Sequence, residues 1–208
     1  MAARARSKAT KGTGRARTRL DVAVRKGELL ELGLAVFASR PYDEVSIDEL
    51  ARQARISKGL LYHYFPTKRD FYVAAIGLAA ERLLAETEVD DALPPLDRLV
   101  AGLGAYLAFV ERHRRAYVAL LRGGIGSAPS VARVVERVRE AFLDRLLSGV
   151  RASGPRARHA MRGWVGFVEA LSLDWAQHED VPKDDIVELA VGVLLELIRR
   201  TGIAVQAR

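Results

Sequence analysis

The chain has 208 residues, half of them hydrophobic, with few aromatic residues and no cysteine. This length accommodates one domain or two small ones with a sizeable core. The lack of cysteine excludes disulfides, thiolate nucleophiles and cysteine metal sites, and it is typical of a reducing cytoplasm. No apolar run approaches the ~20 residues that a membrane span requires, so we expect a cytoplasmic protein.

The net charge of +7 is concentrated in the first third of the chain. Residues 1–75 hold 15 Lys and Arg against 8 Asp and Glu, whereas residues 76–208 hold 18 of each. Seven of the basic residues lie within residues 1–20, which contain no acidic residue. We expect these 20 residues to form a disordered basic tail. Such a tail serves either solubility or contacts with DNA phosphates and the minor groove.

The first helix is predicted over residues 21–39, where apolar residues recur at helical spacing until Arg40-Pro41 ends the pattern. A second helix is predicted from Ser46, a suitable N-cap, with Glu49 placed to complete a capping box. Its apolar face extends to Ala54.

A third, short helix follows at once, with Ser57 as its N-cap. It must end before Pro66, because the residue that precedes a proline is driven out of the helical conformation. Two short helices joined by a tight turn form a helix-turn-helix, whose second helix can enter the major groove of DNA.

The third helix is expected to turn Leu61 and Phe65 inward and to present polar or flat side chains outward. The outward set consists of Lys58, Gly59, Tyr62, His63 and Tyr64. Thr67 is suited to cap the next helix, which would leave Lys68 and the first-turn N–H groups near a phosphate.

These residues resemble the DNA-binding domain of the TetR family of bacterial one-component regulators. The resemblance covers about residues 20–75 and depends on Phe37, Ser46 to Ala54, Ser57-Lys58-Gly59, Tyr62-His63-Tyr64-Phe65 and Lys68. It implies that Ser46, Tyr62 and Lys68 bind phosphates. It also implies that bases or the adjacent backbone are contacted by Ser57, Lys58, Leu60 and His63.

Two residues depart from the family pattern. Arg55 stands where the family usually has a turn glycine. The turn therefore either carries ~1 kcal/mol of backbone strain or adopts a different geometry. Leu60 stands where a small or hydroxylated residue is common, and a leucine can touch a thymine methyl group but cannot hydrogen-bond a base edge.

Six further helices are predicted over residues 67–89, 96–110, 113–121, 130–150, 156–177 and 184–201. The helix over residues 67–89 starts beside the helix-turn-helix and connects it to the rest of the chain. The glycine-rich stretch from Arg122 to Pro129 lacks the Lys-Ser/Thr of a P-loop and is predicted to be a loop. The predicted fold is all-α with about nine helices. A helix-turn-helix DNA-binding domain spans residues 21–67, and a helical effector-binding and dimerisation domain spans residues 68–208.

The last two predicted helices combine small and large apolar residues. The small ones are Gly163, Gly166, Ala170, Ala190 and Gly192, and the large ones are Trp164, Phe167, Leu171, Val193, Leu194 and Leu197. The TetR resemblance implies a homodimer held by a four-helix bundle of this pair; the alternative is an ordinary intramolecular core. A symmetric dimer would bring two recognition helices to the half-sites of an inverted-repeat DNA operator.

The middle helices can enclose a cavity with an apolar lining, which suits a hydrophobic small molecule or an acyl chain as effector. The candidate lining residues are Tyr106, Phe109, Tyr117, Phe142, Trp164, Phe167 and Trp175. A ligand that prefers the DNA-incompetent spacing of the dimer would shift the population toward it, and the helix over residues 67–89 would transmit the change.

Catalytic sites are not indicated. The four histidines, His63, His113, His159 and His178, form no metal-binding spacing, and no nucleophile elbow is present. We therefore expect no catalytic residue, no metal site and no cofactor. The hypothesis is a transcriptional repressor that a hydrophobic effector releases from DNA. The alternative, which Arg55 and Leu60 leave open, is a helical protein-interaction module without specific DNA binding.

Overall fold

The computed structural model describes residues 12–123, 128–150, 154–178 and 180–202. Within these residues the fold is all helical, which confirms the predicted fold class. The nine α-helices found there are α1 (Gly12–Ser39), α2 (Ile47–Gln53), α3 (Lys58–Tyr64), α4 (Lys68–Glu86), α5 (Pro95–Arg112), α6 (Arg114–Arg122), α7 (Pro129–Val150), α8 (Pro155–His178) and α9 (Lys183–Thr201). A short 3-10 turn over Tyr42–Glu44 precedes α2.

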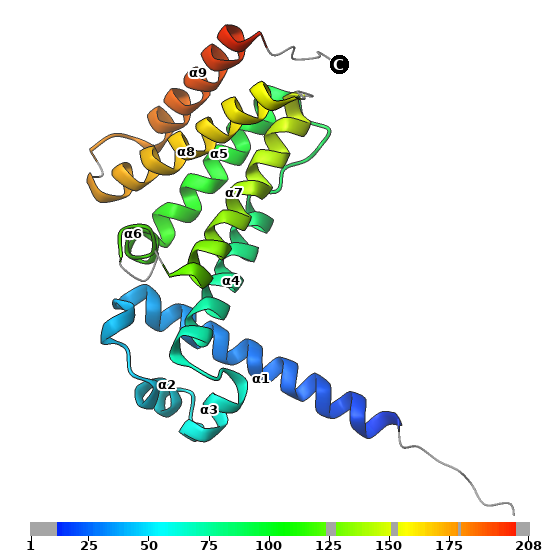
Figure 1. Ribbon diagram of the computed structural model, residues 1–208, viewed down its shortest axis with the longest axis vertical. Coiled ribbons are helices and arrows are strands. Elements are labelled where there is room, and N and C mark those ends of the chain that lie inside the picture. The colour runs from blue at the N-terminus through cyan, green and yellow to red at the C-terminus, as the bar shows by residue number, and fades with distance from the viewer. Residues whose placement is uncertain (1–11, 124–127, 151–153, 179, 203–208) are drawn as a thin grey trace, which may run out of the picture.

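The helices form two regions that α4 joins (Figure 1). The region of α1, α2 and α3 lies at one end of the long axis, and we call it the helix-turn-helix unit. Helices α5 to α9 lie at the other end, and we call this region the effector domain after its predicted role. Helix α4 packs against α1 in the first region and against α7 and α5 in the second.

The start of α1 corrects the predicted disordered tail. Helix α1 begins at Gly12, so residues 12–20 are helical, and this part of the helix projects away from the rest of the molecule (Figure 1). Residues 12–20 include three arginines and one alanine, which favour a helix, but also two glycines and two threonines, which do not. These residues extend a helix that tertiary packing has already nucleated further along, so the cost of a new nucleus does not arise. Residues 1–11 lie outside the described residues.

Aromatic side chains dominate the core of the helix-turn-helix unit. Phe71 from α4 is fully buried and packs beside Phe37 and Phe65, with ring centroids 6.0 Å and 4.7 Å away. Gly33 of α1 allows this close packing, because a Cβ atom at that position would stand 2.8 Å from Cζ of Phe71. The core also includes Val131 at the start of α7, so the effector domain packs against the helix-turn-helix unit at this point.

The core of the effector domain combines residues of α5, α7, α8 and α9, with Leu107, Leu143, Met161 and Leu194 among the most deeply buried. Trp164 ties α8 to α9 by donating its indole N–H to the backbone carbonyl of Ala190 at 2.9 Å.

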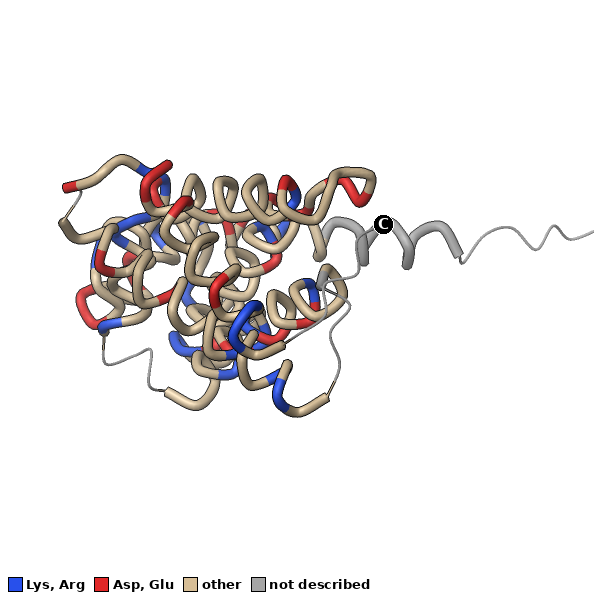
Figure 2. Tube along the Cα trace, turned by 90° about the horizontal axis from the view of Figure 1, so that it is seen from above, with Lys and Arg blue, Asp and Glu red and all other residues tan. Residues whose placement is uncertain are grey.

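Charged residues of both signs are interspersed over the effector-domain end of the molecule (Figure 2). Several form ion pairs between helices, such as Arg158 with Glu140 and Lys183 with Glu111. The excess of basic residues therefore belongs to the first third of the chain. None of the helices in the described residues is long and apolar enough to cross a bilayer.

Candidate functional site

Helix α3 is held against the helix-turn-helix unit by a narrow apolar edge. Leu61 is fully buried, and Phe65, which follows the helix, is 3% exposed. The Ser57 hydroxyl accepts a hydrogen bond from the Leu60 N–H at 3.1 Å, as expected of an N-cap. Phe65 adopts an extended conformation before Pro66, so α3 ends where the proline predicts. The face of α3 that carries Leu60, Tyr62 and His63 is exposed.

The turn between α2 and α3 keeps its geometry despite the arginine. Arg55 has φ of +54°, in the left-handed region that a glycine would adopt more readily. The Ile56 N–H donates to the Ala51 carbonyl at 3.0 Å and the Arg55 N–H to the Arg52 carbonyl at 3.1 Å. This pair of hydrogen bonds is a Schellman motif. Of the two predicted alternatives, the structure therefore has the turn with a strained backbone at Arg55, and not a turn of different geometry.

Only one of the two hydrogen bonds of the predicted capping box forms at the N-terminus of α2. Ser46 Oγ accepts from the Glu49 N–H at 3.1 Å. The Glu49 carboxylate does not complete the capping box, because it accepts instead from the side chains of Arg40 and Gln53. Ser46 itself remains exposed.

The residues that the sequence assigned to DNA contact are mostly exposed. Ser57, Lys58, Gly59, Leu60, Tyr62 and His63 all lie at the surface. Tyr64 is half-buried against the core of the unit, so it contributes only part of its ring to the outer face. Their roles in DNA binding remain predictions.

Two of the basic candidates already have partners within the chain. The Lys58 ammonium lies 2.9 Å from a carboxylate oxygen of Asp48, and this contact raises the pKa of Lys58. Lys68 Nζ lies 4.2 Å from the centroid of the Tyr42 ring, a cation–π distance. Sequence reasoning missed Asp48, although its place in the first turn of α2 could have drawn attention to it.

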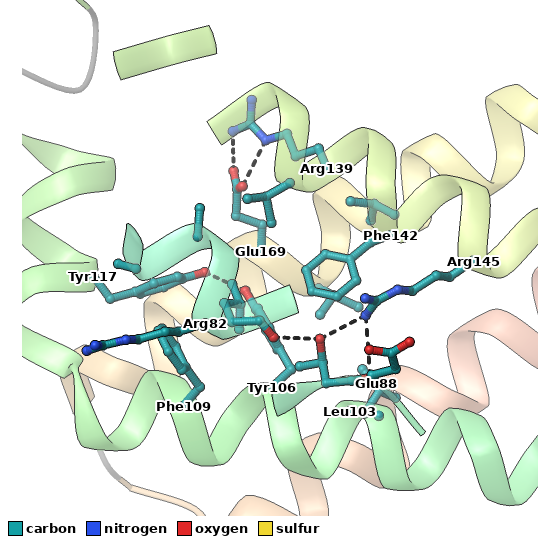
Figure 3. Close-up of a pocket in the computed structure, with 18 of the residues that line it drawn as sticks. Arg82, Glu88, Leu103, Tyr106, Phe109, Tyr117, Arg139, Phe142, Arg145 and Glu169 are labelled. Carbon is teal, nitrogen blue, oxygen red and sulfur yellow. Dashed lines mark hydrogen bonds and ion pairs between the residues drawn. The ribbon is translucent and has the colours of Figure 1, made fainter. Parts of the chain in front are cut away.

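A cavity of about 960 Å³ lies between the helix-turn-helix unit and the effector domain. Residues of α1, α4, α5, α6, α7, α8 and α9 contribute to its mostly apolar wall. Five predicted residues line it: Tyr106, Phe109, Tyr117, Phe142 and Trp164. Figure 3 shows how several of them surround the space.

Two of the predicted lining residues lie elsewhere. Trp175 is 5% exposed and donates its indole N–H to the Val181 carbonyl at 3.0 Å, so it fixes the connection from α8 to α9. Phe167 is half-buried and packs against the edge of the effector-domain core. Both belong to α8, whose cavity-facing side carries Trp164, Val165 and Val168 instead.

Three sets of polar groups at the cavity were not anticipated. The hydroxyl groups of Tyr106, Tyr117 and Ser172 meet within hydrogen-bonding distance of one another. The Arg139 guanidinium forms a bidentate ion pair with Glu169, at 2.9 Å and 2.5 Å (Figure 3). A lone serine in the apolar stripe of α8 was the signal that could have identified Ser172.

Arg145 forms the third set and links α7 to the end of α4. Its guanidinium donates to the Leu84 carbonyl at 2.8 Å and to the Thr87 hydroxyl at 2.9 Å. Carbonyl groups in the last turn of a helix have no partner within it, so an arginine there stabilises the helix end. Within the described residues, no group of three or more potential metal-binding side chains comes together.

Comparison with known proteins identifies the family. Residues 29–75 match the model for bacterial regulatory proteins of the tetR family, and residues 95–196 match the tetracyclin repressor-like C-terminal domain. The chain is 30% identical over 189 residues to the transcriptional activator FasR of Mycolicibacterium smegmatis, covering 85% of this chain and 84% of FasR. The chain belongs to the TetR family of transcriptional regulators. It is therefore a DNA-binding transcriptional regulator, with α3 as the second helix of its helix-turn-helix.

Other TetR-family proteins agree with this assignment. The transcriptional repressor KstR of Mycobacterium tuberculosis is 26% identical over 180 residues, which cover 82% of this chain and 80% of KstR. A tetR-family regulator from Streptomyces coelicolor superposes with a TM-score of 0.79 at 31% identity, covering 86% of this chain and 82% of that one. These relatives include an activator and a repressor, so family membership leaves the direction of regulation open.

The last two helices of this TetR-family chain divide their residues between two faces. Trp164, Ala190 and Leu194 are buried in the chain's own core, contrary to their expected place among the dimer residues. The outer faces carry Gly163 and Gly192, where a Cβ atom would meet nothing within 4 Å. Leu189 on the same side of α9 is 49% exposed. The outer faces of α8 and α9 therefore combine small residues with the exposed Leu189.

Proposed function

We propose that this regulator is a homodimeric repressor that binds an inverted-repeat operator through α3 and leaves it when a hydrophobic small molecule fills the cavity. The outer faces of α8 and α9 form the dimer contact. Small residues let helices approach closely, and the exposed Leu189 supplies apolar area. The KstR relatives, named as repressors, support the direction of control.

The observation that carries the proposal is the path of α4. Its first turns bury Phe71 and Tyr72 in the core that supports α3, and its last turn lies at the cavity, where Arg145 holds it to α7. Any ligand that moves the cavity wall at this end acts on the helix that positions the DNA-binding unit. Helix α6 provides a second contact, because Tyr117 lines the cavity and Leu120 packs against the core of the helix-turn-helix unit.

Thermodynamic linkage sets the size of the response. The effector shifts the equilibrium toward the DNA-incompetent spacing only by the ratio of its affinities for the two states. The dimer is essential to this mechanism, because a rigid tilt of α4 changes the distance between two α3 helices but leaves a single half-site contact unaltered.

Operator selection from genomic fragments with the purified protein tests the DNA-binding part of the proposal. The recovered sites should share an inverted repeat and bind two chains, and their affinity should exceed that for random DNA by at least 10³-fold at physiological salt. Weak affinity for every fragment, lost as salt rises, would reject a specific operator.

Substitutions in the helix-turn-helix unit separate positioning from readout. Tyr62→Ala and Lys68→Ala should weaken binding to all sequences alike, whereas Lys58→Ala and His63→Ala should change the preference among operator variants. Lys183→Ala is a matched control, because it removes a cation from the effector domain, where Lys183 pairs with Glu111. Loss of affinity in the control would show that net charge alone governs binding.

The dimer contact is tested by placing a charge on α9. Leu189→Glu should convert the protein to a monomer in sedimentation equilibrium and abolish operator binding. Leu93→Glu serves as the control, because Leu93 is exposed to 39% but lies in the loop before α5. A dimer that withstands Leu189→Glu would place the contact elsewhere.

A reporter gene fused to the selected operator and its promoter tests the direction of control. Deletion of the regulator should raise expression from this promoter. A fall in expression would show that the protein is an activator, as FasR is named, while the operator and dimer parts of the proposal would be unaffected.

A further inference from the structure

Hydroxyl groups from three helices meet at one place in the cavity wall. Tyr106 of α5 and Tyr117 of α6 have their Oη atoms 2.6 Å apart, and Ser172 Oγ of α8 lies 3.0 Å and 2.9 Å from them. The two tyrosines line the cavity, and Ser172 lies behind them, fully buried. We call these residues the hydroxyl cluster; Figure 3 shows Tyr106 and Tyr117 within the cavity wall.

The cluster has more hydrogen-bonding contacts than hydroxyl hydrogens. Ser172 also donates to the backbone carbonyl of Glu169 at 3.0 Å, so three hydrogens serve four contacts. When Ser172 donates to that carbonyl, one phenol hydrogen is enough to join Tyr106 and Tyr117. The other phenol can then donate to a ligand oxygen while every hydroxyl hydrogen remains bonded. The unshared lone pairs can accept a hydrogen from a ligand hydroxyl.

The charges in the described cavity wall are matched within the chain. Three arginines pair with carboxylates: Arg82 with Glu31, Arg98 with Asp91 and Arg139 with Glu169. Arg145 is bound to the carbonyl end of α4, and Glu88 lies beside it in Figure 3. A charged ligand in this cavity would lose its hydration, and the described wall holds no spare counter-ion to compensate for that loss.

The hydroxyl cluster itself is also neutral. Burial raises the pKa of Tyr106 and raises that of Tyr117 well above its ordinary value, so both phenols keep their hydrogens at physiological pH. Burial, followed by the charge of Arg112, lowers the pKa of His113, which favours the neutral imidazole in the same wall.

We propose that the effector is an uncharged, mostly apolar molecule with at least one carbonyl or hydroxyl oxygen, and that the hydroxyl cluster binds this oxygen. The inference rests on the proposed role of the cavity as the effector site. The oxygen meets Tyr106 and Tyr117, and the apolar remainder lies along side chains such as Leu103 and Phe142. Because the cluster joins α5, α6 and α8, binding the oxygen acts on three helices at once.

Displacement of the fluorescent apolar probe N-phenyl-1-naphthylamine from the full-length protein tests the ligand class. The competitors are decan-2-one, decan-1-ol, undecane and decanoate, which are similar in size but differ in their polar group. Tyr117→Phe should weaken decan-2-one and decan-1-ol about 5- to 10-fold, the value of one neutral hydrogen bond. Undecane should bind the variant and the natural protein equally.

Tyr72→Phe is the matched control. Tyr72 also lines the cavity, but its hydroxyl is not part of the cluster. This substitution should leave all four affinities within twofold of the natural protein. Tyr106→Phe provides a second variant of the cluster. The Tm of each variant shows whether a loss of ligand affinity arises from unfolding. Equal losses for the ketone and the hydrocarbon in both cluster variants would overturn the proposal.

Preference for decanoate would also overturn it, because that result would assign recognition to an arginine such as Arg145. The same ligands added to an operator-binding assay separate the two proposals. Oxygen-dependent binding that leaves DNA affinity unchanged would support the ligand class and reject the proposed release from DNA. Failure of every neutral ligand to displace the probe or raise the Tm would reject both.

Discussion

The helix-turn-helix unit and the effector domain are built from similar amphipathic helices but are packed differently. In the first, rings of Phe37, Phe65 and Phe71 interlock around a glycine contact that leaves no room for a methyl group. In the second, helices α5 to α9 line a cavity together with α4 and α1, and hydroxyl groups and an ion pair lie at its wall. The helix-turn-helix unit is therefore packed around buried rings, whereas the effector domain leaves space between its helices.

The largest expected difference between the two regions is in the free energy of unfolding that each loses when a phenylalanine is replaced by alanine. Phe71→Ala should lower the free energy of unfolding by about 3–5 kcal/mol, because the fully buried ring leaves a void in a close-packed core. Phe142→Ala should cost about 1–2 kcal/mol, because the half-buried ring already borders the cavity and loses fewer contacts. Urea denaturation measures both, and equal losses would contradict the contrast in packing.

Alkaline pH should destabilise the helix-turn-helix unit, and Tyr72 should contribute to this effect. Burial raises the pKa of Tyr72 to about 12, whereas the unfolded chain should titrate near 10. The folded state holds this proton more tightly, so the stabilisation is complete below pH 10 and is lost as pH rises through 12. The loss amounts to about 2–3 kcal/mol.

The Tyr72→Phe variant isolates this effect. Between pH 9.5 and 11.5 its urea midpoint should fall less steeply than that of the natural protein. Tyr62→Phe, which alters an exposed tyrosine of α3, should leave the slope unchanged. Parallel curves for the natural protein and the Tyr72 variant would show that another group controls the alkaline transition.

A smaller effect is expected at the contact between α1 and α4. Gly33→Ala should lower the free energy of unfolding by about 1–2 kcal/mol, because the new methyl group must displace the buried ring of Phe71. Gly27→Ala, on the same helix, should instead stabilise by about 0.5–1 kcal/mol, since its Cβ would meet nothing within 4 Å. Two changes of the same sign would reject close packing at Gly33.

The smallest effect concerns the turn before α3. Arg55→Gly should raise the free energy of unfolding by about 1 kcal/mol, because glycine adopts a φ of +54° without steric cost. Ala54→Gly should destabilise by a similar amount, since Ala54 ends α2 in a right-handed conformation. Operator affinity should stay within threefold for both variants, and a larger change would show that Arg55 itself contacts DNA.

Local signals in the sequence were sufficient for the helix boundaries near α3. Ser57 caps its start and Pro66 ends it, because both residues act on the backbone beside them. The predicted capping box failed in its second half because Arg40, nine residues away, competes for the Glu49 carboxylate. The start of α1 was also missed, because a basic segment with a single large apolar residue gives no apolar periodicity even when it continues a packed helix.

The sequence by itself determined that the chain folds into helices, where most of them begin and end, and which motif carries the family resemblance. Those features depend on backbone preferences and on apolar spacing within one helix. Only the tertiary structure decided that Trp164 faces the cavity while Phe167 and Trp175 do not, and that Tyr106, Tyr117 and Ser172 meet. Helical spacing shows which residues share a face, but the packing of distant helices determines what that face contacts.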